Sequence, residues 1–172
     1  MKKSDIIVIT TGGTIEKTYN EMDGSLSNRG SQLKKMLKRL RLPYTSITHH
    51  DLFYKDSLDM TDEDREQITQ TTQQLLKEQK PIVILHGTDT MELTAEYMYN
   101  VLDPVPAPVV FTGAMTPFGF ENSDALQNFT EALYASQIID PGIYISMHGM
   151  LHSMPGVVKN RQTGTFVKRK IR

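Results

Sequence analysis

Short apolar runs alternate with longer amphipathic segments along most of this chain. Strong strands are predicted at residues 6–9, 82–85, 109–112 and 143–147, and a weaker one at 45–49. The runs Ile6-Ile7-Val8-Ile9 and Ile82-Val83-Ile84-Leu85 contain no polar position, which is typical of parallel strands that are covered on both faces. The pattern therefore predicts a sheet whose strands are joined by helices.

Between these strands, apolar residues recur at the spacing of amphipathic helices. We expect one helix between Ser31 and Pro43, and a polar helix from the N-cap Thr61 toward Lys80. The inner face of a third helix is expected to comprise Met91, Thr94, Ala95, Met98, Val101 and Leu102. A fourth helix is expected to begin at Ser123 or Asp124 and to bury Leu126, Phe129, Leu133 and Ile138.

This alternation predicts an α/β fold: a single three-layer αβα domain around a mainly parallel sheet of about five strands, Rossmann-like or flavodoxin-like. The 172 residues fit one domain. Two segments lack a sustained periodic spacing of apolar residues. Ile15–Gly30 is polar and is expected to be a mobile loop and a candidate lid, and the residues after Met147 are expected to be irregular with at most a short ribbon.

The amino-acid composition restricts the classes of partner that this chain is expected to bind. Nineteen basic residues face 20 acidic ones, so no bulk field draws the chain to nucleic acid or membrane, and a small-molecule partner is expected. The short basic end, Lys168–Arg172, is interpreted as a solvated tail. Without cysteine there is no disulfide or thiol nucleophile. Too few apolar residues precede Thr10 for a signal peptide, so a cytoplasmic protein is expected.

Two Thr-centred loops directly follow predicted strands. Thr11-Gly12-Gly13-Thr14 follows the first strand, and His86-Gly87-Thr88-Asp89-Thr90 follows the strand at 82–85. Ligands of parallel sheets bind outside the carboxyl ends of the strands, so the hydroxyls and the carboxylate are expected to face one crevice. Alone, the first loop is most often only a turn or a phosphate cradle.

The histidines give weaker signals. His86, at a strand end, is interpreted as a hydrogen-bonded core residue rather than a ligand. His148 and His152 have a spacing that metal ligands use on helices, but Gly149 between them argues against a helix. No metal site is assigned.

Five segments resemble, in order and spacing, signature segments of the bacterial-type L-asparaginases. Three carry most of the resemblance: Thr11-Gly12-Gly13-Thr14-Ile15, His86-Gly87-Thr88-Asp89-Thr90-Met91-Glu92 and Gly113-Ala114-Met115-Thr116-Pro117. Two more fit the same family: Ser57-Leu58-Asp59-Met60 and Val158-Lys159-Asn160. The resemblance extends to about Phe166, and the ordered set is far more specific than any one segment.

The resemblance implies hydrolysis of L-asparagine to L-aspartate and ammonia without a cofactor. Thr14 would be the primary nucleophile, because a Thr hydroxyl attacks an amide once a neighbouring base takes its proton. Thr88 would be a second catalytic hydroxyl, activated by Lys159 with Asp89 nearby. Tyr19 would assist Thr14 from the lid.

The resemblance also implies how the substrate is held. Asp89 would anchor the α-ammonium group, and Ser57, with the amides of the loop that contains Asp59, would anchor the α-carboxylate. Backbone N–H groups near Thr88 would hold the oxyanion. The remaining expected substrate-binding positions are Gly13, Gly87 and Ala114.

In one respect the chain departs from the family. The usual member continues into a second, smaller α/β domain, whereas this sequence ends at Arg172. Residues 1–172 are therefore expected to form the N-terminal-type domain alone, without the family's C-terminal domain. In longer members a neighbouring subunit's carboxylate helps to hold the α-amino group, and no residue here is assigned to that task. A homo-oligomer, dimer or tetramer, is expected.

Two other functions compete with a short-chain asparaginase that has weak glutaminase activity. One is a non-catalytic amino-acid sensor that keeps the Asp89 and Ser57 anchors. A pure binding module, however, has no use for Thr14, Thr88 and Lys159 together. The other is an amidohydrolase for a different β-amide, admitted by a more open site.

Overall fold

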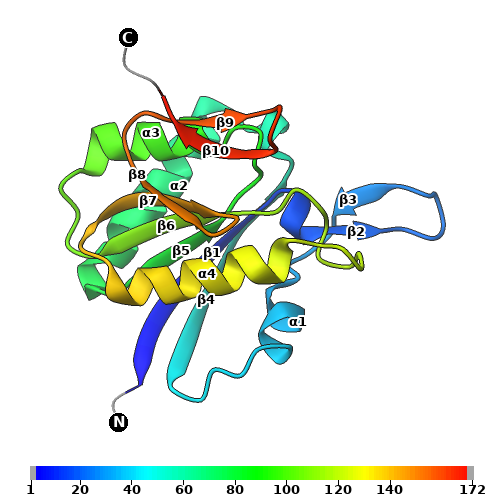
Figure 1. The fold of residues 1–172 in the computed structure, drawn as a ribbon, viewed down its shortest axis with the longest axis horizontal. Coiled ribbons are helices and arrows are strands. Elements are labelled where there is room, and N and C mark those ends of the chain that lie inside the picture. The colour runs from blue at the N-terminus through cyan, green and yellow to red at the C-terminus, as the bar shows by residue number, and fades with distance from the viewer. Residues whose placement is uncertain (1–2, 170–172) are drawn as a thin grey trace.

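The computed structural model describes residues 3–169 and has a six-stranded central sheet in the order β4-β1-β5-β6-β7-β8 (Figure 1). The strands are β1 (Ser4–Gly12), β4 (Thr45–Lys55), β5 (Ile82–Leu85), β6 (Pro108–Thr112), β7 (Gly142–Met147) and β8 (Met150–Ser153). All neighbours pair in parallel except β7 and β8, which are antiparallel. The predicted α/β class and mainly parallel sheet are confirmed, with one strand more than expected.

Helices cover both faces of the sheet (Figure 1). They are α1 (Leu33–Lys38), α2 (Asp62–Leu75), α3 (Met91–Leu102) and α4 (Ala125–Ile138). Ile6 and Val8 pack with residues of α1 and α4, whereas Ile7 and Ile9 pack with residues of α2 and α3. Because successive side chains of a strand point to opposite faces, the fully apolar run of β1 serves two cores. The three-layer arrangement is thus confirmed.

The predicted helix boundaries hold in part. Thr61 caps α2 as expected, in a capping box with Asp64. The first helix ends at Lys38, and α2 passes into a short 3₁₀ turn, Leu76–Glu78. Two residues predicted to face inward are exposed instead, Val101 at 54% and Ile138 at 62%, and each lies in the last turn of its helix.

The segments predicted to be irregular are more ordered than expected. Residues 14–16 form a 3₁₀ turn, and β2 (Lys17–Tyr19) pairs with β3 (Leu26–Asn28) in a hairpin that stands away from the sheet (Figure 1). After Met147, β8 joins the central sheet. The prediction of a mobile loop at 15–30 was therefore wrong in its secondary structure. The strand β8 was missed because Met-Leu-His-Ser does not alternate between apolar and polar residues.

A second ribbon, β9 (Val157–Asn160) and β10 (Thr165–Lys168), lies beside α3. Phe166 pairs with Lys159, so both side chains lie on the same face of the ribbon. Phe166 and Val157 are buried in the core with β7 and α3. The apolar side chains thus dock the ribbon and fix the position of Lys159.

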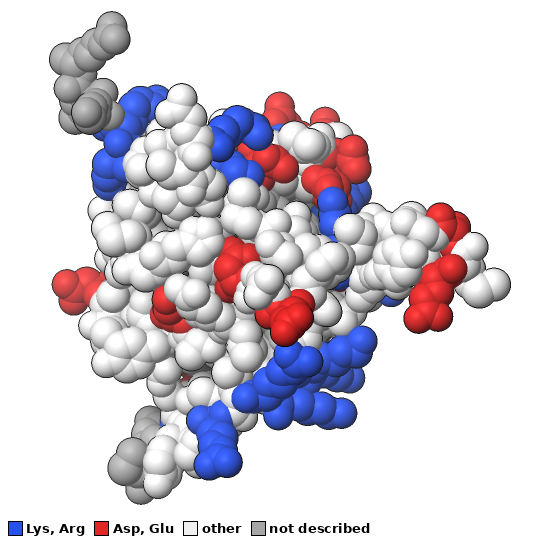
Figure 2. Space-filling model, turned by 45° about the vertical axis from the view of Figure 1, so that its right-hand side comes forward, with Lys and Arg blue, Asp and Glu red and all other residues white. Residues whose placement is uncertain are grey.

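The described surface carries both charges without one dominant field. Basic residues gather over α1, whereas acidic residues lie at the tip of the β2–β3 hairpin (Figure 2). Within residues 3–169, no helix is both long and apolar enough to cross a membrane. Residues 170–172 of the basic end lie outside the described part of the chain.

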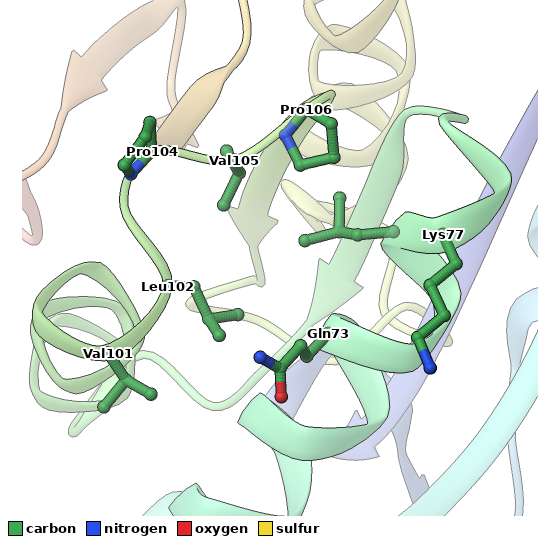
Figure 3. A pocket seen from close by; sticks show the side chains of 8 residues that line it. Gln73, Lys77, Val101, Leu102, Pro104, Val105 and Pro106 are labelled. Carbon is green, nitrogen blue, oxygen red and sulfur yellow. The ribbon is translucent and has the colours of Figure 1, made fainter.

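A hollow of about 310 Å³ lies between the ends of α2 and α3 and the segment that precedes β6 (Figure 3). Val101, Leu102, Val105 and Leu76 give it a mostly apolar lining, with Lys77 at its side. Because Pro106 comes just before β6 begins, the hollow lies at the amino end of that strand. It is therefore remote from the loops that follow the strands.

We expect Phe166→Ala to lower the free energy of unfolding by about 3–5 kcal/mol, because it removes a fully buried ring that docks the β9–β10 ribbon. Phe120→Ala is the control, since Phe120 is 46% exposed and its loss should cost under about 0.5 kcal/mol. Urea unfolding measures both. Equal, small losses would show that the ribbon is not held by its apolar face.

Candidate active site

The strand order reverses between β1 and β5, and the space outside the carboxyl ends of these two strands is called the crevice below. From β1 the chain crosses outward to β4 and then returns to β5 on the other side of β1, so the direction of winding reverses there. Thr10 of β1 pairs with Leu85 of β5, which starts both Thr-centred loops at the same level of the sheet. Ligands of such folds bind at this reversal, outside the carboxyl ends of the strands.

The two loops are in direct contact through glycines. A Cβ atom on Gly13 would lie 2.4 Å from the Gly87 Cα atom, and one on Gly87 would lie 2.5 Å from the Ser57 Oγ atom. Gly13 also has a φ of 79°, which other residues rarely adopt. Both expected positions are therefore glycine for a packing reason, and these contacts bring the segments that contain Thr14, Ser57 and Thr88 together.

The Thr14 loop is braced from behind by a glutamate that sequence analysis did not single out. Thr14 begins the 3₁₀ turn and is partly exposed, whereas Glu16 in the same turn is fully buried. The Glu16 carboxyl accepts hydrogen bonds from the Gly12 N–H at 3.1 Å and the Ser31 hydroxyl at 2.6 Å. Burial raises the pKa of Glu16 to about 7, against the bonds from Ser31 and Gly12, which lower it.

Lys159 joins the ribbon to the Thr88 loop. Its Nζ atom donates to Thr88 Oγ1 at 2.8 Å and to Asp89 Oδ1 at 3.0 Å, and its side chain is only 7% exposed. Thr88 itself is 4% exposed. Lys159 lies about 70 positions from Thr88 and Asp89 in the chain, and the structure brings its amine into contact with both the hydroxyl and the carboxylate.

Asp89 also contacts Arg161, which sequence analysis missed. Arg161 Nη1 lies 3.1 Å from Asp89 Oδ1, the same oxygen that Lys159 contacts. Burial by itself would raise the pKa of Asp89, but the hydrogen bonds and charges of Lys159 and Arg161 lower it below its usual value. Asp89 is therefore a carboxylate at neutral pH.

The Ser57 loop forms another wall of the crevice. Ser57 is buried in a 3₁₀ turn, and its carbonyl oxygen accepts a 2.8 Å hydrogen bond from the Thr90 hydroxyl. Its own Oγ atom is buried without a hydrogen-bond partner among the described residues. Asp59, in the same turn, is exposed and lines a polar hollow of about 340 Å³ with Lys17 and Asp56.

The loop after β6 closes the crevice from a third side. Thr88 Oγ1 lies 3.6 Å from the sulfur atom of Met115, and Ala114 is buried. Asp124 accepts hydrogen bonds from the N–H groups of Met115 and Thr116, each at 3.0 Å, instead of capping α4 with its side chain. This carboxylate therefore fixes the backbone beside Thr88.

His148 extends that brace to the ribbon. Its Nε2 atom lies 2.7 Å from Asp124 Oδ2, and its Nδ1 atom lies 3.1 Å from Thr165 Oγ1 on β10. Sequence analysis noted the His148 and His152 spacing only as a metal pattern. Within residues 3–169, no three His, Asp or Glu side chains are grouped to hold a metal ion.

Tyr19 and His86, which the sequence analysis discussed, lie outside the cluster of Lys159, Thr88 and Asp89. Tyr19 is on β2, is 60% exposed and lines a hollow with residues of α1 and Phe118–Phe120. His86 is fully buried, as interpreted from the sequence, and lies 2.9 Å from Thr94 Oγ1. Burial lowers the pKa of His86 to about 4, so it is neutral and structural.

Comparison with known proteins gives the family of this chain. Residues 5–167 match the family model described as "Asparaginase, N-terminal". This chain belongs to the asparaginase family. It is 36% identical over 141 residues to L-asparaginase 1 of Escherichia coli K12, covering 79% of this chain and 41% of that protein. It is 32% identical, also over 141 residues, to the L-asparaginase of Thermococcus kodakarensis, covering 82% and 43%.

A solved structure of this asparaginase family extends the match to the fold. The probable cytoplasmic L-asparaginase of Campylobacter jejuni superposes with a TM-score of 0.81 at 26% identity, covering 96% of this chain and 52% of that one. The resemblance drawn from the five sequence segments is thus confirmed. The chain spans about two fifths of the length of the curated relatives it matches.

We expect Glu16 to make stability fall as pH rises. Its pKa of about 7 exceeds the unfolded value of 4.5, so the folded state retains a proton that the unfolded state releases between these values. Between pH 4.5 and 7.5 the raised pKa lowers the free energy of unfolding by about 3 kcal/mol, and this loss is absent from Glu16→Gln. Urea unfolding at both pH values measures the difference between wild type and variant. The exposed Glu121→Gln is the control, and a pH-independent difference for Glu16→Gln would contradict the assignment.

Proposed function

We propose that this chain hydrolyses the side-chain amide of L-asparagine to L-aspartate and ammonia. One observation carries the proposal: Lys159 Nζ is within hydrogen-bond distance of both Thr88 Oγ1 and Asp89 Oδ1. A buried amine in contact with a hydroxyl is the arrangement that activates a hydroxyl for amide chemistry. Membership of the asparaginase family supports the same reaction.

In this proposal, the Thr14 hydroxyl attacks the amide carbon, and its proton passes to the departing ammonia. The close approach of Gly13 to Gly87 supports this role, because it puts the loop that carries Thr14 against the Thr88 loop. Water then cleaves the resulting ester and releases L-aspartate. Thr88, Asp89 and Lys159 form the second catalytic group, in which Lys159 accepts the Thr88 proton while neutral. Tyr19 is proposed to assist Thr14 when the hairpin moves.

The substrate is held at its charged ends. Asp89, a carboxylate at neutral pH, receives the α-ammonium group. The unpartnered Ser57 Oγ atom supports binding of the α-carboxylate in the loop that also contains Asp59, since a buried hydroxyl without a partner gains a hydrogen bond there. Backbone N–H groups near Thr88 and Ala114 are proposed to hold the oxyanion.

Side activity on L-glutamine belongs to the same proposal. One extra methylene in a pocket changes binding by only about 1–3 kcal/mol, so the discrimination against glutamine is modest. We also propose a single domain over the described residues, a homo-oligomer and a cytoplasmic location. Exposed apolar residues on α4 and β8 support the oligomer: Tyr134, Ile138, Met150 and Leu151.

Thr14→Ala and Thr88→Ala are each expected to lower kcat for ammonia release from L-asparagine by at least about 10²-fold, because each removes a hydroxyl assigned to the chemical step. Thr130→Ala is the matched control: it removes an exposed hydroxyl on α4 and should leave kcat unchanged. A coupled ammonia assay measures all three.

Retention of turnover in both Thr14→Ala and Thr88→Ala would refute these residue roles. Binding of L-aspartate or L-asparagine by the wild type, measured by calorimetry, without any ammonia release would instead identify an amino-acid sensor. Release of ammonia from other β-amides but not from L-asparagine would identify a different amidohydrolase.

A further inference from the structure

The Asp89 carboxylate carries one negative charge and contacts two cationic side chains. Lys159 Nζ lies 3.0 Å and Arg161 Nη1 lies 3.1 Å from the same oxygen, Oδ1. The three groups together therefore hold a net positive charge at the position proposed for a substrate ammonium. An incoming ammonium gains one attraction there and meets two repulsions.

The two cations differ in how firmly they are held. The Lys159 side chain is 7% exposed and is also bonded to Thr88, whereas the Arg161 side chain is 71% exposed. Arg161 lies in the turn between β9 and β10, which Asn160 stabilises by accepting hydrogen bonds from the N–H groups of Gln162 and Thr163. Only the guanidinium can leave Asp89 for water without breaking the buried junction.

We propose that Arg161 competes with the substrate ammonium for Asp89 and thereby sets the selectivity of the site. This inference rests on the proposed function only for the place of the ammonium. When a ligand with an α-ammonium binds, its nitrogen takes the Arg161 position beside Asp89, and the guanidinium turns toward solvent. A ligand that has the two carboxylates but no ammonium leaves the Arg161–Asp89 pair intact.

The expected effect is small because the pair is exposed. Exposed ion pairs contribute little, so removing the competitor should change affinity by about two- to fivefold. Tighter binding should appear only for ligands with an ammonium. This dependence on one ligand group separates competition at Asp89 from a general change in the field of the crevice.

L-aspartate and succinate make the comparison, since they differ only by the α-ammonium group. Calorimetry on wild type and Arg161→Gln is expected to show L-aspartate binding about two- to fivefold more tightly to the variant. Succinate should bind equally well or more weakly, because the variant loses a positive charge. The affinity of Arg161→Lys for L-aspartate should lie between those of wild type and Arg161→Gln. Arg41→Gln, which removes an exposed arginine before β4, is the control and should change neither ligand.

Weaker L-aspartate binding by Arg161→Gln, or equal tightening of both ligands, would overturn the inference. So would failure of the wild type to bind L-aspartate at all. Ammonia release from L-asparagine, measured on the same preparations, tests the proposed function separately. If Arg161→Gln binds L-aspartate selectively more tightly while the wild type releases no ammonia, this inference stands and the proposed hydrolase function is refuted.

Discussion

The arrangement of the crevice depends on one buried ammonium group. Lys159 Nζ is almost withdrawn from water, and a charge so placed is tolerated only when hydrogen bonds and an opposite charge receive it. Thr88 and Asp89 supply both. The same contacts tie the β9–β10 ribbon to the loop that follows β5, so the position of this one amine links segments that are distant in sequence.

That contact is possible only because the surrounding pieces fix its geometry. Phe166 and Val157 hold the ribbon in the core, and the Gly13–Gly87 contact brings the Thr14 loop against the Thr88 loop. Asp124 and His148 connect the loop after β6 to β10. The hydroxyls, the amine and the carboxylate are thus held by core packing and backbone hydrogen bonds rather than by the β2–β3 hairpin.

The sequence predicted the features that depend on local pattern. Apolar runs located the parallel strands, and loops directly behind those runs fell at the carboxyl edge, where the strand order reverses. Features set by distant partners were not predictable in this way. Arg161 contacts a residue 72 positions away, and Glu16 is recognisable as buried only once Ser31 and Gly12 surround it. The strand β8 was missed because its four residues, Met-Leu-His-Ser, neither alternate between apolar and polar nor form a sustained apolar run.

A crystal structure of Thr14→Ala with L-asparagine tests most directly where the substrate lies between the two loops. We expect the α-ammonium beside Asp89, the α-carboxylate beside Ser57 and the amide carbon about 3–3.5 Å from where the Thr14 hydroxyl would stand. Arg161 should then have left Asp89. Asparagine bound elsewhere, or with its ammonium turned away from Asp89, would contradict this placement.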